Sequence, residues 1–168
     1  MRARGFTLIE LIVVVSVVAL LFGVALERLL RYQEMGERAA LEQNLAAINT
    51  ALTMRFAAYI AAGKPRAIES VAGKNPVDLL ERAPENYLGE LFAPEVGTLA
   101  RTSWYFDRSS GELVYLPGRR RYLSSESGPP DAIRFRVVLS QPRDPAEEPP
   151  SLRQPFILPT VPFRWVIE

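Results

Sequence analysis

The feature that most constrains this chain is an uninterrupted apolar block from Phe6 to Leu26, FTLIELIVVVSVVALLFGVAL. Its 21 residues contain a single charged side chain, Glu10. As a helix at 1.5 Å per residue, the block would be about 31 Å long, close to the hydrocarbon thickness of a bilayer. A surface helix of a soluble domain is apolar along one stripe, whereas this segment is apolar all round. We therefore expect residues 6–26 to form a membrane-spanning helix.

Three kinds of segment could carry such a block. It could be an ordinary secretory signal with the small residues at 23–25 as its cleavage site, or a plain membrane anchor. It could also be a segment that is cut before the apolar run, between Gly5 and Phe6. Glu10 helps to separate these interpretations. Placing a carboxylate within a membrane-spanning helix costs about 2.5–3.5 kcal/mol on membrane-insertion scales. A simple signal or anchor has no use for it, so an intramembrane acid is by default a functional residue.

The residues Gly5 to Leu11, GFTLIEL, follow a short leader and precede about 16 apolar residues. This arrangement resembles the type III signal of type IV pilins and of the pseudopilins of type II secretion systems. The resemblance implies that a prepilin peptidase, a membrane aspartyl peptidase, cuts after Gly5 and methylates the new amino terminus at Phe6. Glu10 then corresponds to the acidic residue five positions into the mature chain. The leader would be residues 1–5.

The chemistry of the cleaved end suggests a role for Glu10. Cleavage creates an α-amino group at Phe6, whose reference pKa of about 7.7–8.0 allows it to carry a positive charge at neutral pH. In an apolar environment this ammonium and the Glu10 carboxylate are both poorly solvated. Pairing the ammonium of one subunit with Glu10 of its neighbour would relieve both penalties and set the register of assembly. The alternative is that Glu10 only reaches back to the lipid headgroups.

Orientation follows from Arg2 and Arg4, because positive residues remain on the cytoplasmic side of a membrane. The carboxyl-terminal part then lies in the periplasm of a two-membrane bacterium, and the protein starts as a single-pass protein of the inner membrane. The resemblance also implies its partners: other pilin-like subunits, the prepilin peptidase, and an inner-membrane assembly platform with a cytoplasmic ATPase. The mature subunit would end in a pilus or pseudopilus.

Residues 27–62 continue the helix with an amphipathic pattern. Acid-to-base pairs at i,i+4 spacing support a helix, and an apolar face recurs at helical spacing at Leu41, Leu45, Ile48, Leu52, Phe56 and Tyr59. Ala61-Ala62-Gly63 before Pro65 makes a plausible stop, so a continuous helix from Phe6 to Ala62 would be about 85 Å long. Glu27 stands where many major pilins have a helix-kinking proline, which leaves the path of the helix open.

Residues 63–168 are sufficient for one α+β head. Asn75 as an N-cap and Pro76 at the first helical position predict a short helix over 75–82. The strand-forming runs predict a hairpin of 102–107 and 112–116, a third strand over 133–140 and a fourth over 163–167. We expect an antiparallel sheet that covers the apolar face of the long helix. The proline-rich segment 142–162 is interpreted as an irregular excursion, since proline removes ladder donors.

Several kinds of chemistry are excluded or disfavoured. The chain contains no histidine and no cysteine, so a Ser-His-Asp triad, a disulfide and a cysteine-based zinc site are ruled out. No phosphate-binding loop motif occurs, and we expect no enzymatic activity, no cofactor and no metal. Asp144, Glu147 and Glu148 lack calcium-loop spacing. Arg119–Arg121 follows Pro117-Gly118 as in a solvated turn, and with a net charge of +1 we do not expect DNA binding.

The sequence therefore predicts a structural subunit, either a type II secretion pseudopilin or a minor type IV pilin. Its fold would be α+β, with a long amino-terminal helix and a small antiparallel head. The absence of cysteine disfavours a major pilin, because many of those have a carboxyl-terminal disulfide. The alternative is a periplasmic binding or adaptor domain delivered by an ordinary signal peptide or held by a membrane anchor.

Overall fold

The computed structural model describes residues 7–126, 128–140 and 153–167. One helix, α1 (Leu8–Ala61), accounts for 54 of them. Apart from its last two residues, the chain divides into two compact units after Gly36. We describe residues up to 36 and residues 37–166 separately.

The amino-terminal unit contains the first part of α1. Among the described residues, α1 is the one helix that is long and apolar enough to cross a membrane. No residue of its most apolar 18-residue window is buried. The helix continues through Glu27 without interruption, so the missing proline at this position leaves a regular helix. The predicted helix from Phe6 to Ala62 is confirmed to within two residues at one end and one at the other.

The second part of α1 belongs to the unit of residues 37–166 and contributes to its core. Leu41, Ile48 and Leu52 are buried, which confirms the predicted apolar face. The helix ends where Gly63 adopts a φ of 68°, and the N–H of Lys64 donates to the carbonyl of Tyr59 at 2.9 Å. Glycine adopts this left-handed conformation without the steric cost that a side chain would impose.

Three short 3₁₀ helices follow among the described residues of the head. They are η1 (Pro65–Val71), η2 (Pro76–Leu79) and η3 (Val96–Thr98). Asn75 caps η2 as predicted, because its side-chain oxygen accepts from the N–H of Val77 at 3.1 Å. The helix predicted over 75–82 is shorter than expected, since η2 ends at Leu79.

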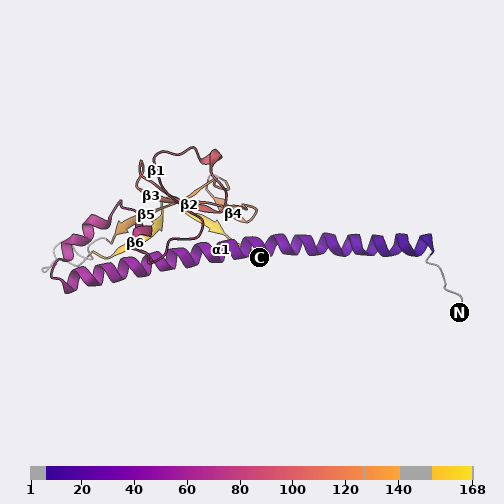
Figure 1. The fold of residues 1–168 in the computed structure, drawn as a ribbon, viewed down its shortest axis with the longest axis horizontal. Coiled ribbons are helices and arrows are strands. Elements are labelled where there is room, and N and C mark those ends of the chain that lie inside the picture. The colour runs from indigo at the N-terminus through magenta and orange to yellow at the C-terminus, as the bar shows by residue number, and fades with distance from the viewer. Residues whose placement is uncertain (1–6, 127, 141–152, 168) are drawn as a thin grey trace. The chain divides into compact units, whose positions relative to one another are not determined.

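The described residues of the head form two sheets (Figure 1). The larger has the strand order β1-β2-β3-β5-β6, and β4 pairs with β7 in a smaller one. The strands are β1 (Tyr87–Leu91), β2 (Ser103–Asp107), β3 (Glu112–Leu116), β4 (Leu123–Ser125), β5 (Ile133–Leu139), β6 (Pro155–Pro159) and β7 (Phe163–Trp165). The predicted hairpin is β2 and β3, and the predicted third strand is β5. The expected strand near the carboxyl end is β7, although it lies in the smaller sheet.

Strand β1 is not among the strands that the sequence predicts. The strand is only five residues long and contains Gly89 at a φ of 92°, where its register with β2 shifts. A glycine at such a bulge interrupts the alternating pattern that marks a strand. Because β1 runs parallel to β2, the sheet is mostly rather than wholly antiparallel.

The interpretation of residues 142–162 as an irregular excursion was wrong for its second half. Residues 155–159 form β6, which pairs with β5 and lies at the edge of the sheet. An edge position tolerates proline, because one side of the strand needs no ladder donor. The N–H of Ile157 donates to the side-chain oxygen of Asn49 at 3.0 Å, so α1 covers this edge.

Both faces of the larger sheet are buried at its centre, since all residues of β2 and β3 are buried. On one face the Trp104 ring lies 4.7 Å from the Tyr115 ring and 5.9 Å from the Phe135 ring, centroid to centroid. On the other face Tyr105, Val114 and Leu116 form a cluster, which the segment from Leu91 to Leu99 covers. The sequence therefore yields the expected α+β head packed on the long helix.

Candidate functional site

The start of α1 has a local cap that the sequence analysis did not identify. The carbonyl of Thr7 accepts from the N–H of Leu11 at 3.1 Å, and its hydroxyl oxygen accepts from the N–H of Glu10 at 3.3 Å. This geometry places Thr7 at the N-cap and Glu10 three residues into the helix, and the bond to the Thr7 hydroxyl is one of the two bonds of a capping box. The signal was present as the spacing T-x-x-E. The helix therefore begins at Leu8, only two residues after Phe6.

Glu10 lies in the first turn of α1, where the partial positive charge of the helix amino terminus favours an acid. Its side chain is exposed, and no ion pair or side-chain hydrogen bond engages it among the described residues. Gly5 and Phe6 lie outside the described residues, so their proposed cleavage and methylation stay predictions. A carboxylate placed at this point of an apolar helix needs a partner from lipid or from another chain.

The surface around Glu10 is apolar on every side. The large hydrophobic side chains from Leu8 to Leu26 are 46–76% exposed, so nothing in the described part of the chain covers them. The one hydroxyl among them, that of Ser16, donates to the carbonyl of Ile12 at 2.8 Å and is satisfied within the helix. Such a large exposed apolar surface requires lipid or other protein chains.

In the head, the Glu37 carboxylate binds the segment that follows β3. Oε1 accepts from the Tyr115 hydroxyl at 2.9 Å and from the N–H of Gly118 at 2.6 Å. Oε2 accepts from the N–H of Arg119 at 3.3 Å. Burial, together with the nearby Glu37 charge, raises the pKa of Tyr115 far above its usual range, which keeps the hydroxyl protonated as a donor.

Gly118 is required at this contact. A Cβ at this position would lie 2.6 Å from the Thr102 methyl carbon and 3.2 Å from a Glu37 oxygen. Beyond it, Arg120 forms an ion pair with the exposed Asp131, and the Arg121 guanidinium lies 5.7 Å from the Tyr122 ring centroid. The arginine run is therefore a turn tied to its own domain.

The structure brings Asp107 and Glu112 opposite each other across the β2–β3 hairpin. Arg134 lies 3.5 Å from Asp107 and 3.2 Å from Glu112, and Arg136 lies 3.0 Å from Glu112. Although burial opposes ionisation, hydrogen bonds and these arginines hold the pKa of both carboxyls below the usual range. Two ionised carboxylates that are already paired with guanidinium groups have a structural rather than an acid–base role.

Within the described ranges, no group of three or more acidic residues could hold a metal ion. Asp144, Glu147 and Glu148, the residues considered for calcium, lie outside the described residues.

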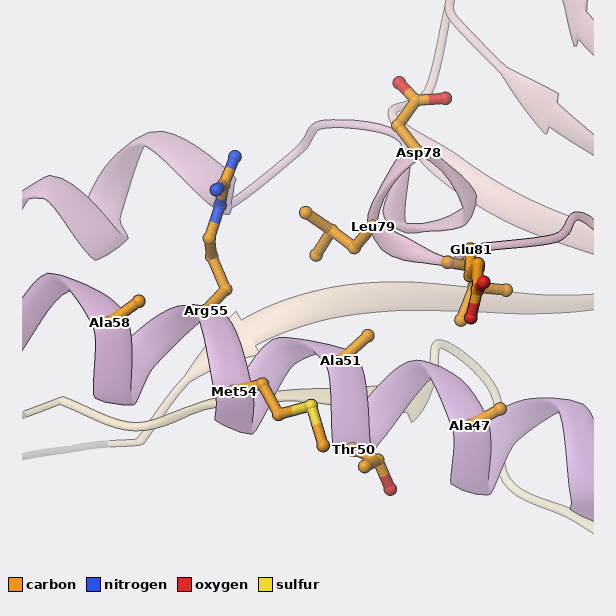
Figure 2. A pocket seen from close by; sticks show the side chains of 10 residues that line it. Ala47, Thr50, Ala51, Met54, Arg55, Ala58, Asp78, Leu79 and Glu81 are labelled. Carbon is orange, nitrogen blue, oxygen red and sulfur yellow. The ribbon is translucent and has the colours of Figure 1, made fainter.

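A groove of about 690 Å³ lies between α1 and the η2 segment of the head (Figure 2). The α1 wall presents small side chains, and the opposite wall presents Leu79 and Leu80. Charged side chains stand at its rim, Arg55 on α1 and Asp78 and Glu81 across from it. Pockets that bind small ligands have volumes in this range, but this groove has no cluster of catalytic groups.

Comparison with known proteins gives one match. The family model described as the prokaryotic N-terminal methylation motif matches residues 1–26. Comparison with curated proteins and with solved structures gives no match. The match covers the segment in which Gly5, Phe6 and Glu10 lie.

Proposed function

We propose that this chain is a structural subunit of a type II secretion pseudopilus or a type IV pilus. The premise is that residues 1–26 carry the prepilin signal of type IV pilins and pseudopilins. The motif match carries the proposal. The exposed apolar surface of α1 supports it, because a helix of this kind serves first in the membrane and then among neighbouring subunits.

In this proposal the prepilin peptidase cuts between Gly5 and Phe6 and methylates Phe6. The new ammonium of one subunit then pairs with the Glu10 carboxylate of the next. Capping by Thr7 supports this arrangement, since it places Glu10 in a regular first turn only four residues after Phe6. Subunits can slide past each other in an apolar helix bundle, and one charge pair fixes their register.

The proposed topology has the amino terminus in the cytoplasm and the head in the periplasm, with the helix in the inner membrane before assembly. The partners are other pilin-like subunits, the prepilin peptidase and an assembly platform. A cytoplasmic ATPase would supply the work of extrusion, because the subunit has no phosphate-binding loop motif. We assign no enzymatic activity to the chain. The absence of cysteine favours a pseudopilin or a minor pilin over a major pilin.

Mass spectrometry of the mature amino terminus tests the proposal. The chain is expressed with a prepilin peptidase, and the terminal peptide of the membrane-extracted protein is sequenced. We expect N-methylated Phe6 as the first residue. Without the peptidase, residues 1–5 should remain. A chain that starts at Leu26 in both cases would contradict the proposal and would support the periplasmic binding or adaptor domain instead.

A further inference from the structure

One aromatic side chain of the head is held out into solvent. Phe92, which follows β1 directly, is 75% exposed. The next residue, Ala93, has a φ of 44°, a left-handed conformation that a residue with a Cβ adopts only at a cost in energy. Conformations of this kind persist where the surrounding structure imposes them, and they often mark functional positions.

The hairpin of β2 and β3 imposes this turn. The N–H of Ala93 donates to Oδ1 of the buried Asp107 at 3.3 Å, and the N–H of Arg108 donates to the carbonyl of Leu91 at 2.8 Å. Asp107 is itself fixed by the N–H and the hydroxyl of Ser109, at 3.0 and 2.6 Å. The backbone that carries Phe92 is therefore fixed, so the projection loses little backbone entropy on binding a partner.

The groove between α1 and η2 is the complementary feature. Alanine methyl groups of α1 form one wall, and Figure 2 shows Leu79 on the opposite side of the opening. Thr50 presents its methyl group without an unsatisfied hydroxyl, because Oγ1 donates to the carbonyl of Ala46 at 2.9 Å. Phe92 is not among the residues that line the groove, so a chain does not fill its own groove with this ring.

The charges beside the two features match. Phe92 is flanked by the exposed Glu95 and by Arg108, whose side chain is 64% exposed and forms only a long ion pair, 3.8 Å, with the partly exposed Glu90. The groove has Arg55 on one rim and Glu81 on the other. Neither Arg55 nor Glu81 forms an ion pair within the part of the chain that the structure describes. Opposite charges at the rim of an interface set its register and orientation.

We propose that Phe92 of one copy of this chain docks into the α1–η2 groove of the next copy, with Arg108 opposite Glu81 and Glu95 opposite Arg55. The projection and the groove are different surfaces, so the contact is heterologous: each copy offers a projection to one neighbour and a groove to another. Repeated contacts of this type generate open filaments rather than closed dimers. The proposal rests on the proposed function as a fibre subunit. It adds a contact between the head domains of neighbouring copies to the assembly through the helix.

Cysteine cross-linking in the full chain tests this contact, since the chain contains no native cysteine. The variant Arg108→Cys/Glu81→Cys is assembled into fibres or concentrated in detergent micelles and oxidised. We expect a ladder of disulfide-linked oligomers. The same variant with Phe92→Ala added should lose the ladder at least about tenfold, because truncating an aromatic anchor removes much of the affinity of an interface. Arg108→Cys/Ser124→Cys, with its second cysteine at an exposed position away from the groove, serves as the matched control.

A ladder of equal strength from the control, or one unaffected by Phe92→Ala, would overturn the proposal. So would cross-linking of Arg108→Cys alone at the efficiency of the double variant, because that result indicates a symmetric contact. The mature amino terminus is measured on the same samples. A processed chain without the ladder rejects the docking contact alone, whereas a chain without processing at Phe6 rejects the proposed function.

Discussion

Glu10→Ala is expected to leave membrane insertion intact and to abolish incorporation into fibres. Alanine is a strong helix former, so α1 persists, and an uncharged residue inserts into lipid at least as readily as an acid. The unpaired ammonium of Phe6 would then be buried without a counter-charge, which costs about 3–5 kcal/mol. The expected loss is at least about a hundredfold in the incorporated fraction relative to the membrane pool. Quantitative immunoblotting of sheared fibres and membranes measures it.

Ser16→Ala is the matched control for this prediction. Ser16 is the polar residue that follows Glu10 within the apolar block, but its hydroxyl is already bound to the Ile12 carbonyl at 2.8 Å. Removing it should leave incorporation unchanged within about twofold, because a hydrogen bond within one helix contributes little to assembly. Normal incorporation of Glu10→Ala, or an equal loss in Ser16→Ala, would remove the role that we assign to Glu10.

Glu37→Ala is expected to destabilise the head by about 2–3 kcal/mol, since hydrogen bonds to a charged group are worth about 1.5–3 kcal/mol. The variant loses the acceptor for the Tyr115 hydroxyl and for the N–H groups of Gly118 and Arg119. Gly118 and Arg119 are exposed and can bind water instead, whereas Tyr115 is buried. Chemical denaturation of the full chain in detergent, followed by tryptophan fluorescence, measures the change. Both tryptophans lie in the head, and Trp104 contacts Tyr115.

Glu42→Ala provides the comparison for Glu37→Ala. Glu42 also lies on α1, but it forms an exposed ion pair with Arg38 at 2.8 Å. Exposed pairs of this kind contribute about 0–1 kcal/mol. Glu37→Gln keeps a carbonyl acceptor without the charge. Its loss of unfolding free energy should lie between those of Glu37→Ala and Glu42→Ala. If Glu37→Ala is no more destabilising than Glu42→Ala, the contact does not hold the head to the helix as described.

The sequence predicts those parts of the fold that depend on local patterns. The helical spacing of Leu41, Ile48 and Leu52 identifies the face of α1 that is buried in the head. The hairpin of β2 and β3 follows from two strand-forming runs around a glycine-containing loop. Residues close in sequence make both elements, so their patterns are sufficient.

The remaining strands depend on contacts between distant residues. β6 is a strand because it pairs with β5 and because Asn49, which is 108 residues away, accepts from Ile157. The high proline content of residues 142–162, on which the sequence prediction rested, gives no information about that partner. The contact of Glu37 with Tyr115 spans 78 residues in the same way. In the sequence Glu37 is one of several balanced charges on α1 and has no distinguishing mark.

The candidate site, unlike these strands, could be predicted from residues close together in the sequence. Gly5, Phe6 and Glu10 are predicted from the resemblance of their spacing to the prepilin signal, and the family match covers the same segment. The structure adds the Thr7 cap and the exposure of the apolar surface. Among the described residues Glu10 has no partner for its side chain, and in the proposed assembly that partner belongs to another copy.

Solid-state NMR of mixed fibres tests that pairing most directly. One population of chains carries ¹⁵N at phenylalanine, a second carries ¹³C at the glutamate side-chain carboxyl, and the two are assembled together. A dipolar contact between the Phe6 amine nitrogen and the Glu10 carboxyl carbon can then arise only between neighbouring copies. We predict such a contact at roughly 3.5–4 Å, as expected when the nitrogen lies within hydrogen-bond distance of a carboxylate oxygen. The contact should disappear when the ¹³C-labelled chains carry Glu10→Asp, which removes the labelled carboxyl at this position and so assigns the contact to Glu10. Well-ordered fibres in which the Phe6 amine shows no contact with Glu10 would contradict the account.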